Sequence, residues 1–119
     1  MAYQDCELFL EICYGSDQTF DAVSWMETAL QERAEALLAP LGPAYADMRR
    51  SGDGFGFVSM VRQWDSRDLF DICQGLSQLM DPQGRGRLVA VPAGLGPVLL
   101  WRFTAGEIKE CVVSEGAPT

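Results

Sequence analysis

The segment CELFLEICY, residues 6–14, alternates between two kinds of side chain, and this alternation constrains the fold more than any other feature of the chain. One side of an extended chain is apolar and carries Leu8, Leu10, Ile12 and Tyr14. The other side is mixed and carries Glu7, Phe9, Glu11 and Cys13. Successive side chains of a β-strand point to opposite faces of its sheet. The segment therefore predicts a half-buried strand with a second, partly polar face.

The next segment, TFDAVSWMETALQERAE (residues 19–35), changes the period from two to about 3.6. Thr19 suits an N-cap, and Asp21 suits the positive end of a helix dipole. Apolar residues recur at three- and four-residue steps along one stripe, at Phe20, Val23, Met26, Leu30, Ala34 and Leu37. APLGP, residues 39–43, ends the pattern because its two prolines cannot continue a helix. We expect an amphipathic helix that begins near Thr19.

The remaining segments complete an alternation of strands and helices. Residues 44–50 and 55–64 flank SGDG, in which Asp53-Gly54 is a hairpin signal. A second helix follows Asp65, with a stripe of Leu69, Ile72, Cys73, Leu76, Leu79 and Met80. QGRGR (83–87) is interpreted as a loop, LVAV (88–91) as a short buried strand, and VLLWRF (98–103) with EIKECVV (107–113) as a final hairpin.

This order, β-α-β-β-α-β followed by two strands, predicts an α+β protein. The economical packing is a ferredoxin-like two-layer sandwich, with two helices on one face of an antiparallel sheet and a C-terminal β-hairpin extension. We expect residues 1–115 to form a single domain and residues 116–119 to form a frayed tail. Such a sheet has a second face. If Phe9 shares this face with one side of the final hairpin, the face is too apolar to remain exposed to solvent. A homodimer partner or the curled hairpin would then cover it.

Catalytic signatures are missing from the sequence. The chain has no histidine, which excludes Ser-His-Asp, Cys-His and His-containing metal sites. Its four cysteines form no CxxC pair, so we predict neither a metal nor a cofactor, and we expect buried, unpaired thiols. Glu7 and Glu11 lie about 13 Å apart on one strand, too far for a cooperating acid and base. The protein is therefore predicted not to be an enzyme, although carboxylate, Tyr or Cys chemistry formed only in three dimensions is left open.

The charge of the chain is large and uneven. Seventeen acidic and nine basic residues give a net charge of −8. The first 48 residues contain nine acids and one base, Arg33, whereas the rest of the chain is balanced. An acidic protein repels nucleic acid and anionic lipid and favours basic partners. We expect no nucleic-acid partner and no membrane span, and with no signal peptide recognisable at residues 1–10 we expect a cytoplasmic protein.

Trp25 falls on the acidic side of the first helix, about 145° from its apolar stripe. We interpret this side as a partner-binding surface made of Asp21, Trp25, Thr28, Glu32 and Glu35. An aromatic anchor within a polar rim is typical of a protein-binding hot spot. The alternative is a structural tryptophan, packed under the termini or over Arg33.

Arg85 and Arg87 are candidate contacts for a ligand or anion, because guanidinium groups bind carboxylates and phosphates through paired hydrogen bonds. A solvated turn is the alternative for these two arginines. The leading interpretation is a small acidic protein-binding module of the inhibitor, immunity or adaptor type, which engages a basic protein through its first helix. The alternative is a dimeric ferredoxin-like ligand-sensing domain with a pocket at the sheet face.

Overall fold

The structure, a computed structural model, describes the backbone of residues 5–15 and 18–113 and the side chains up to residue 110. Its elements follow one another in the predicted order. They are β1 (Cys6–Cys13), α1 (Phe20–Leu38), a 3-10 turn η1 (Ala39–Leu41), β2 (Tyr45–Arg50), β3 (Gly54–Val61), α2 (Ser66–Ser77), β4 (Arg85–Pro92), β5 (Val98–Phe103) and β6 (Ile108–Val113). The predicted α+β class is confirmed; the predicted tail, residues 116–119, lies outside the described residues.

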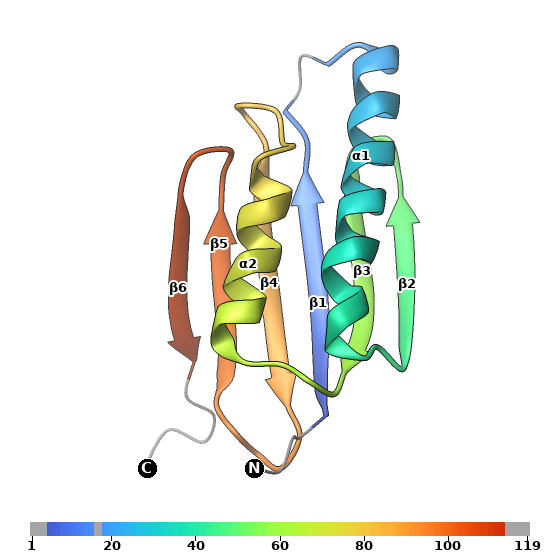
Figure 1. The fold of residues 1–119 in the computed structure, drawn as a ribbon. Helices are drawn as coiled ribbons and strands as arrows, with labels where there is room; N and C mark the ends of the chain where they lie inside the picture. The colour runs from blue at the N-terminus through green and yellow to red at the C-terminus, as the bar shows by residue number, and fades with distance from the viewer. Residues whose placement is uncertain (1–4, 16–17, 114–119) are drawn as a thin grey trace.

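The six strands form one antiparallel sheet in the order β2-β3-β1-β4-β5-β6. Both helices lie on the same face of this sheet, α1 beside β2 and β3 and α2 beside β4 and β5 (Figure 1). The final hairpin, β5 and β6, continues the sheet beyond β4 instead of folding over it. The opposite face of the sheet is therefore left without a second layer among the described residues.

The core lies between the helices and the sheet. It is built from the apolar side of each strand and the inner side of each helix, with Leu8, Leu10, Ile12, Phe57, Leu88 and Trp101 from the sheet and Leu30, Leu38, Leu69, Ile72 and Leu76 from the helices. Burying each such side chain contributes roughly 1.5–3 kcal/mol. The alternation of residues 6–14 thus determines which face of β1 meets the helices.

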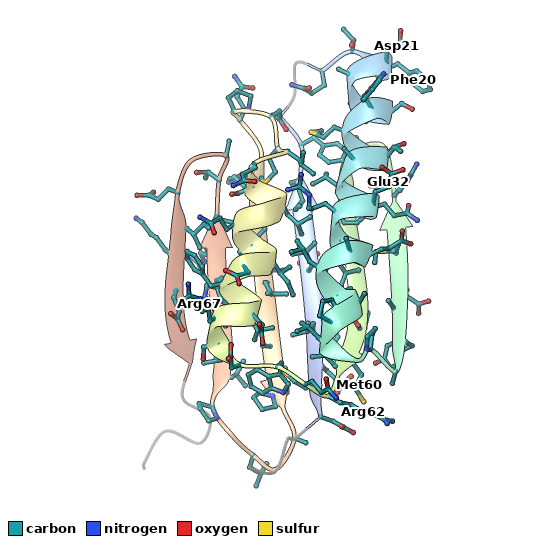
Figure 2. All side chains as sticks on the ribbon, in the orientation of Figure 1. Phe20, Asp21, Glu32, Met60, Arg62 and Arg67 are labelled. Carbon is teal, nitrogen blue, oxygen red and sulfur yellow. The ribbon has the colours of Figure 1, made fainter. Side chains whose placement is uncertain are left out.

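Helix α1 begins as predicted and then departs from the predicted stripe. The Thr19 side chain accepts a hydrogen bond from the backbone N–H of Ala22 at 3.1 Å. Phe20, expected on the buried stripe, is 86% exposed, because the first turns of α1 extend past the end of the sheet (Figures 1 and 2). Glu27 is buried in the stripe instead, and it accepts hydrogen bonds from the Tyr14 hydroxyl at 3.0 Å and the Gly52 N–H at 3.1 Å.

Helix α2 is capped by a reciprocal pair of hydrogen bonds. Asp65 accepts from the Asp68 N–H at 2.9 Å, and the Asp68 side chain accepts from the Asp65 N–H at 3.0 Å. The predicted stripe is buried in α2 at Leu69, Ile72, Cys73 and Leu76, whereas its last two residues, Leu79 and Met80, follow the end of the helix at Ser77. Beyond the helix, buried Asp81 accepts a hydrogen bond from the Gly15 N–H at 2.9 Å, which ties the end of β1 to the turn before β4.

The interpretation of QGRGR as a loop is wrong for three of its residues. Arg85, Gly86 and Arg87 belong to β4, where Arg85 lies opposite Cys13 and Arg87 opposite Glu11 on β1. The glycine that favoured a loop has a packing role, because a Cβ at Gly86 would lie 2.5 Å from the Phe103 ring. The β1 strand pairs with β4 along its whole length, and this pairing draws the two arginines into the sheet.

Candidate functional site

The face of the sheet that points away from the helices, here called the open face, collects the second side chains of every strand. Glu7, Phe9, Glu11 and Cys13 of β1 lie on it, as the alternation predicts. From β4 and β5 it receives Arg85, Arg87, Val89 and Val91 together with Val98, Leu100 and Arg102. The other side of β5, with Leu99, Trp101 and Phe103, is buried under the helices. Phe9 therefore shares the open face with the Val98/Leu100/Arg102 side of the hairpin.

At one end of the open face lies a hollow of about 600 Å³. We call it the basic trough; its lining includes Glu11, Cys13, Arg85, Arg87, Arg102 and Lys109. The four basic side chains come from three neighbouring strands, β4, β5 and β6. Such a hollow, with several convergent charged groups, has the size of a small-molecule site.

The register of the strands places these charges side by side. Arg87 lies opposite Glu11 on one side and opposite Arg102 on the other, and Arg102 lies opposite Lys109. The Arg87 Nε donates to Glu11 Oε1 at 2.9 Å, and its Nη2 donates to the same oxygen. Like charges directly opposite each other on a sheet are unfavourable. Four cations thus line the hollow with two carboxylates, Glu11 and Glu107, and an added anion would relieve the mutual repulsion of the cations.

A second hollow, of about 530 Å³, lies on the other side of β1, with Phe9, Glu11, Cys13, Arg49, Gly54 and Gly56 among its lining residues. Glycine is required in its floor, because a Cβ at Gly54 would lie 2.4 Å from the Ile12 carbonyl oxygen and one at Gly56 would lie 2.7 Å from that of Leu10. Glu11 and Cys13 line both hollows. Five of the nine basic residues of the chain line one hollow or the other, at Arg49, Arg85, Arg87, Arg102 and Lys109.

Only part of this site is identifiable from the sequence. Arg85 and Arg87 were predicted as candidate anion contacts, and the structure brings both into the basic trough on a strand. Glu11 was considered only with Glu7 as an acid–base pair, and Arg102 and Lys109 were not predicted as site residues. The parity of each strand was a usable signal, because it places Glu11 on the same face as Phe9 and Arg102 on the same face as Leu100. Their grouping also needs the strand order, which parity does not supply.

The residues predicted on α1 form a separate surface on the helix side of the molecule. Asp21, Trp25, Thr28, Glu32 and Glu35 are all exposed. Trp25 is 80% exposed, so the alternative of a tryptophan packed under the termini or over Arg33 is wrong. Instead, the Arg33 guanidinium donates a hydrogen bond to the Gly75 carbonyl at 3.1 Å. Figure 2 shows Asp21 and Phe20 at the projecting end of α1 and Glu32 further along it.

The cysteines divide into two environments. Cys6 and Cys73 are buried free thiols, as expected, and desolvation raises the pKa of each to about 12. Cys13, expected to be buried, is exposed because its side chain points to the open face. Among the described residues no group of three or more Cys, Asp or Glu side chains is arranged to hold a metal ion. Neither helix within those residues is long and apolar enough to cross a membrane.

No protein-family model and no curated protein sequence matches the chain.

Proposed function

We propose that the protein is a ligand-binding module that holds small anions in the basic trough. The observation that carries this proposal is the gathering of Arg85, Arg87, Arg102 and Lys109 around one hollow in a chain of net charge −8. Arginine suits carboxylates and phosphates through paired N–H donors. The cations lie on paired strands of the sheet, so their backbone positions are ordered before a ligand arrives.

A ferredoxin-like assignment of the first four strands accompanies this proposal. The chain from β1 to β4 runs β-α-β-β-α-β, and its strands lie in the order β2-β3-β1-β4. The added β5-β6 hairpin widens the sheet and supplies Arg102 and Lys109 to the trough. The fold itself implies no particular ligand, and the residues of the trough support the proposed function.

Anion binding is tested by titrating the labelled protein with inorganic phosphate and acetate while following backbone amide and Arg Nε–Hε signals by NMR. We expect shifts concentrated on β4, β5 and β6, weakening as salt is raised. Arg102→Gln/Lys109→Gln should weaken binding at least ten-fold. Arg67→Gln, on the opposite layer (Figure 2), is the matched control and should leave binding unchanged. Shifts absent from the trough, or equal in both variants, would contradict the proposal.

A second candidate function is supported by α1, whose outer side combines exposed aromatic and acidic residues. Trp25 and Phe20 are 80% and 86% exposed, and Asp21, Glu32 and Glu35 lie exposed on the same helix. This surface suits a basic protein partner, as in an inhibitor, immunity or adaptor protein.

The α1 surface is tested with wild-type and Trp25→Glu baits in cell extract at low and high salt. A basic protein retained only by the wild type, and released by salt, would support the second candidate. Direct binding of that purified protein, lost in Trp25→Glu and kept in Arg102→Gln/Lys109→Gln, would assign it to α1. Equal retention by both baits would reject it.

A further inference from the structure

An apolar row crosses the open face beside the basic trough. Phe9 lies directly opposite Val58 on β3 and Val89 on β4, and Val89 lies opposite Leu100 on β5. We call these four residues the apolar row. Neighbouring strands are about 4.8 Å apart, so the row extends about 14 Å across the sheet. Phe9 is 38% exposed and the other three side chains are half-buried.

The apolar row and the charges of the trough run parallel to each other. Each charged residue lies two positions from a member of the row on the same strand. Glu11 follows Phe9, Arg87 precedes Val89, and Arg102 follows Leu100. Two residues of a strand span about 7 Å. An occupant with a charged group among the cations therefore meets apolar surface within one short step along the sheet.

We propose that the occupant of the basic trough is an amphipathic carboxylate, such as a fatty acid, with its hydrocarbon chain along the apolar row. Its carboxylate lies among Arg87, Arg102 and Lys109. This inference rests on the proposed anion-binding function and specifies the class of ligand.

Charge and apolar surface together favour this occupant over the alternatives. An inorganic anion satisfies the cations but leaves the apolar row in water. A second copy, paired through the same face, covers the row but brings four more trough cations against two trough carboxylates, Glu11 and Glu107, so the excess of positive charge increases. A nucleic acid needs several aromatic rings for stacking, and Phe9 is the one ring in the row. A fatty acid supplies an anionic group for the cations and a hydrocarbon chain for the apolar row in one molecule.

Chain length is the decisive variable in the test. Hexanoate, octanoate and decanoate, each below its micelle concentration, are titrated by calorimetry against the full chain, with phosphate and decyltrimethylammonium as comparison ligands. We expect about four-fold tighter binding for every two added carbons, because a chain on an open face buries about half of its surface. We expect the cationic amphiphile to bind at least ten-fold more weakly than decanoate.

Two variants separate the head and chain contributions. Leu100→Ser should weaken decanoate binding several-fold and leave phosphate binding unchanged, whereas Arg102→Gln/Lys109→Gln should weaken both. The matched control Phe70→Ser removes a 37%-exposed ring from α2 and should change neither. A location-specific readout is the alkylation of Cys13 by N-ethylmaleimide in a Cys111→Ala background, which decanoate should slow at least five-fold.

The outcomes distinguish this inference from the function beneath it. If phosphate and hexanoate bind as tightly as decanoate and depend on Arg102 and Lys109, anion binding stands and the amphipathic ligand is rejected. If no anion binds the trough, both proposals fall. Three other results would overturn the inference. The cationic amphiphile could bind as tightly as decanoate, or decanoate affinity could follow protein dimerisation. The third is that the protein binds anionic phospholipid vesicles but not free decanoate.

Discussion

Two buried carboxylates, Glu27 and Asp81, hold turns at the end of the sheet where the basic trough lies. Glu27 accepts from the Tyr14 hydroxyl and the Gly52 N–H, and Asp81 accepts from the N–H groups of Gly15 and Gln83. Burial, reinforced by the Glu27 hydrogen bond, raises the pKa of Tyr14 well above its ordinary value. The Tyr14 hydroxyl is therefore kept as a neutral donor.

Glu27→Ala is expected to lower the free energy of unfolding by about 1–3 kcal/mol, because it leaves the Tyr14 hydroxyl and the Gly52 N–H without their acceptor. Glu32→Ala, which truncates an exposed acid on the same helix, should change it by less than about 0.5 kcal/mol. Urea denaturation at neutral pH measures both. Equal effects of the two variants would show that Glu27 has no special structural role.

Gly86→Ala is expected to destabilise the protein by about 1–3 kcal/mol, because the added methyl group would overlap the buried Phe103 ring. Gly106→Ala is the control, since nothing lies within 4 Å of a Cβ added there. Thermal denaturation should show a clear decrease in melting temperature for Gly86→Ala alone. A harmless Gly86→Ala would mean that Phe103 moves away at little cost.

At the scale of elements, α1 shows why a helical stripe predicts burial only where a second layer is present. The predicted stripe is buried at Leu30 and Ala34, and Leu38 is buried next to it, but Phe20, on the same side of the helix, projects beyond the strands. On the outer side of the helix, the Trp25 side chain is largely exposed to solvent. The two sides of one helix therefore respond differently to substitution.

Trp25→Glu is expected to change the free energy of unfolding by less than about 0.5 kcal/mol, whereas Leu30→Ala should cost about 2–5 kcal/mol by opening a cavity under the same helix. Far-UV circular dichroism during urea denaturation measures both. A large destabilisation by Trp25→Glu would place that ring in a packing role and remove it from the second candidate function.

At the scale of the whole molecule, charge is separated between the two layers. The helix layer exposes acids, including Asp21, Glu32 and Glu35 of α1 and Asp71 of α2, while the trough gathers four cations on the far side of the sheet. The net charge of −8 hides this basic region. An anionic ligand small enough to reach the trough experiences the nearby cations more strongly than the distant acids, because salt screens beyond about 8–10 Å.

Stability should decrease at alkaline pH because of the buried thiols. Cys6 and Cys73 have pKa values raised to about 12 in the folded protein, against about 8.5 in an unfolded chain. Below pH 8.5 both states keep the protons, so the contribution of the thiols is fully present. As the pH rises from about 8.5 toward 12, only the unfolded chain releases them, and each thiol lowers the free energy of unfolding by about 1.4 kcal/mol per pH unit.

Cys73→Ala should make the free energy of unfolding fall less steeply with pH, because one of the two thiols no longer contributes. Denaturant titrations between pH 8.5 and 11 measure this slope. Leu76→Ala is the control, because it destabilises the same helix without removing a titrating group and should shift the curve while keeping its slope. An unchanged slope in Cys73→Ala would show that the thiol ionises equally in both states.

Local periodicity was sufficient to predict most of the elements. Alternation in residues 6–14 assigned each side chain of β1 to its face, and the N-caps Thr19 and Asp65 marked the helix starts, because these signals depend on neighbours within a few residues. Parity also placed Arg102 with Leu100. Arg85 and Arg87 were missed as strand residues because glycines favour a loop until a pairing strand and the Phe103 ring are in place.

The class of the protein, the order of its elements and the two faces of its strands are readable from the chain alone, since backbone geometry and hydrophobic burial act locally. Three features are visible only in the folded protein: five cations from four strands share one face, β5 and β6 extend the sheet instead of covering it, and the first turns of α1 project beyond the sheet. These features depend on which distant strands pair. Pairing is settled by the packing of the whole core, which no single segment encodes.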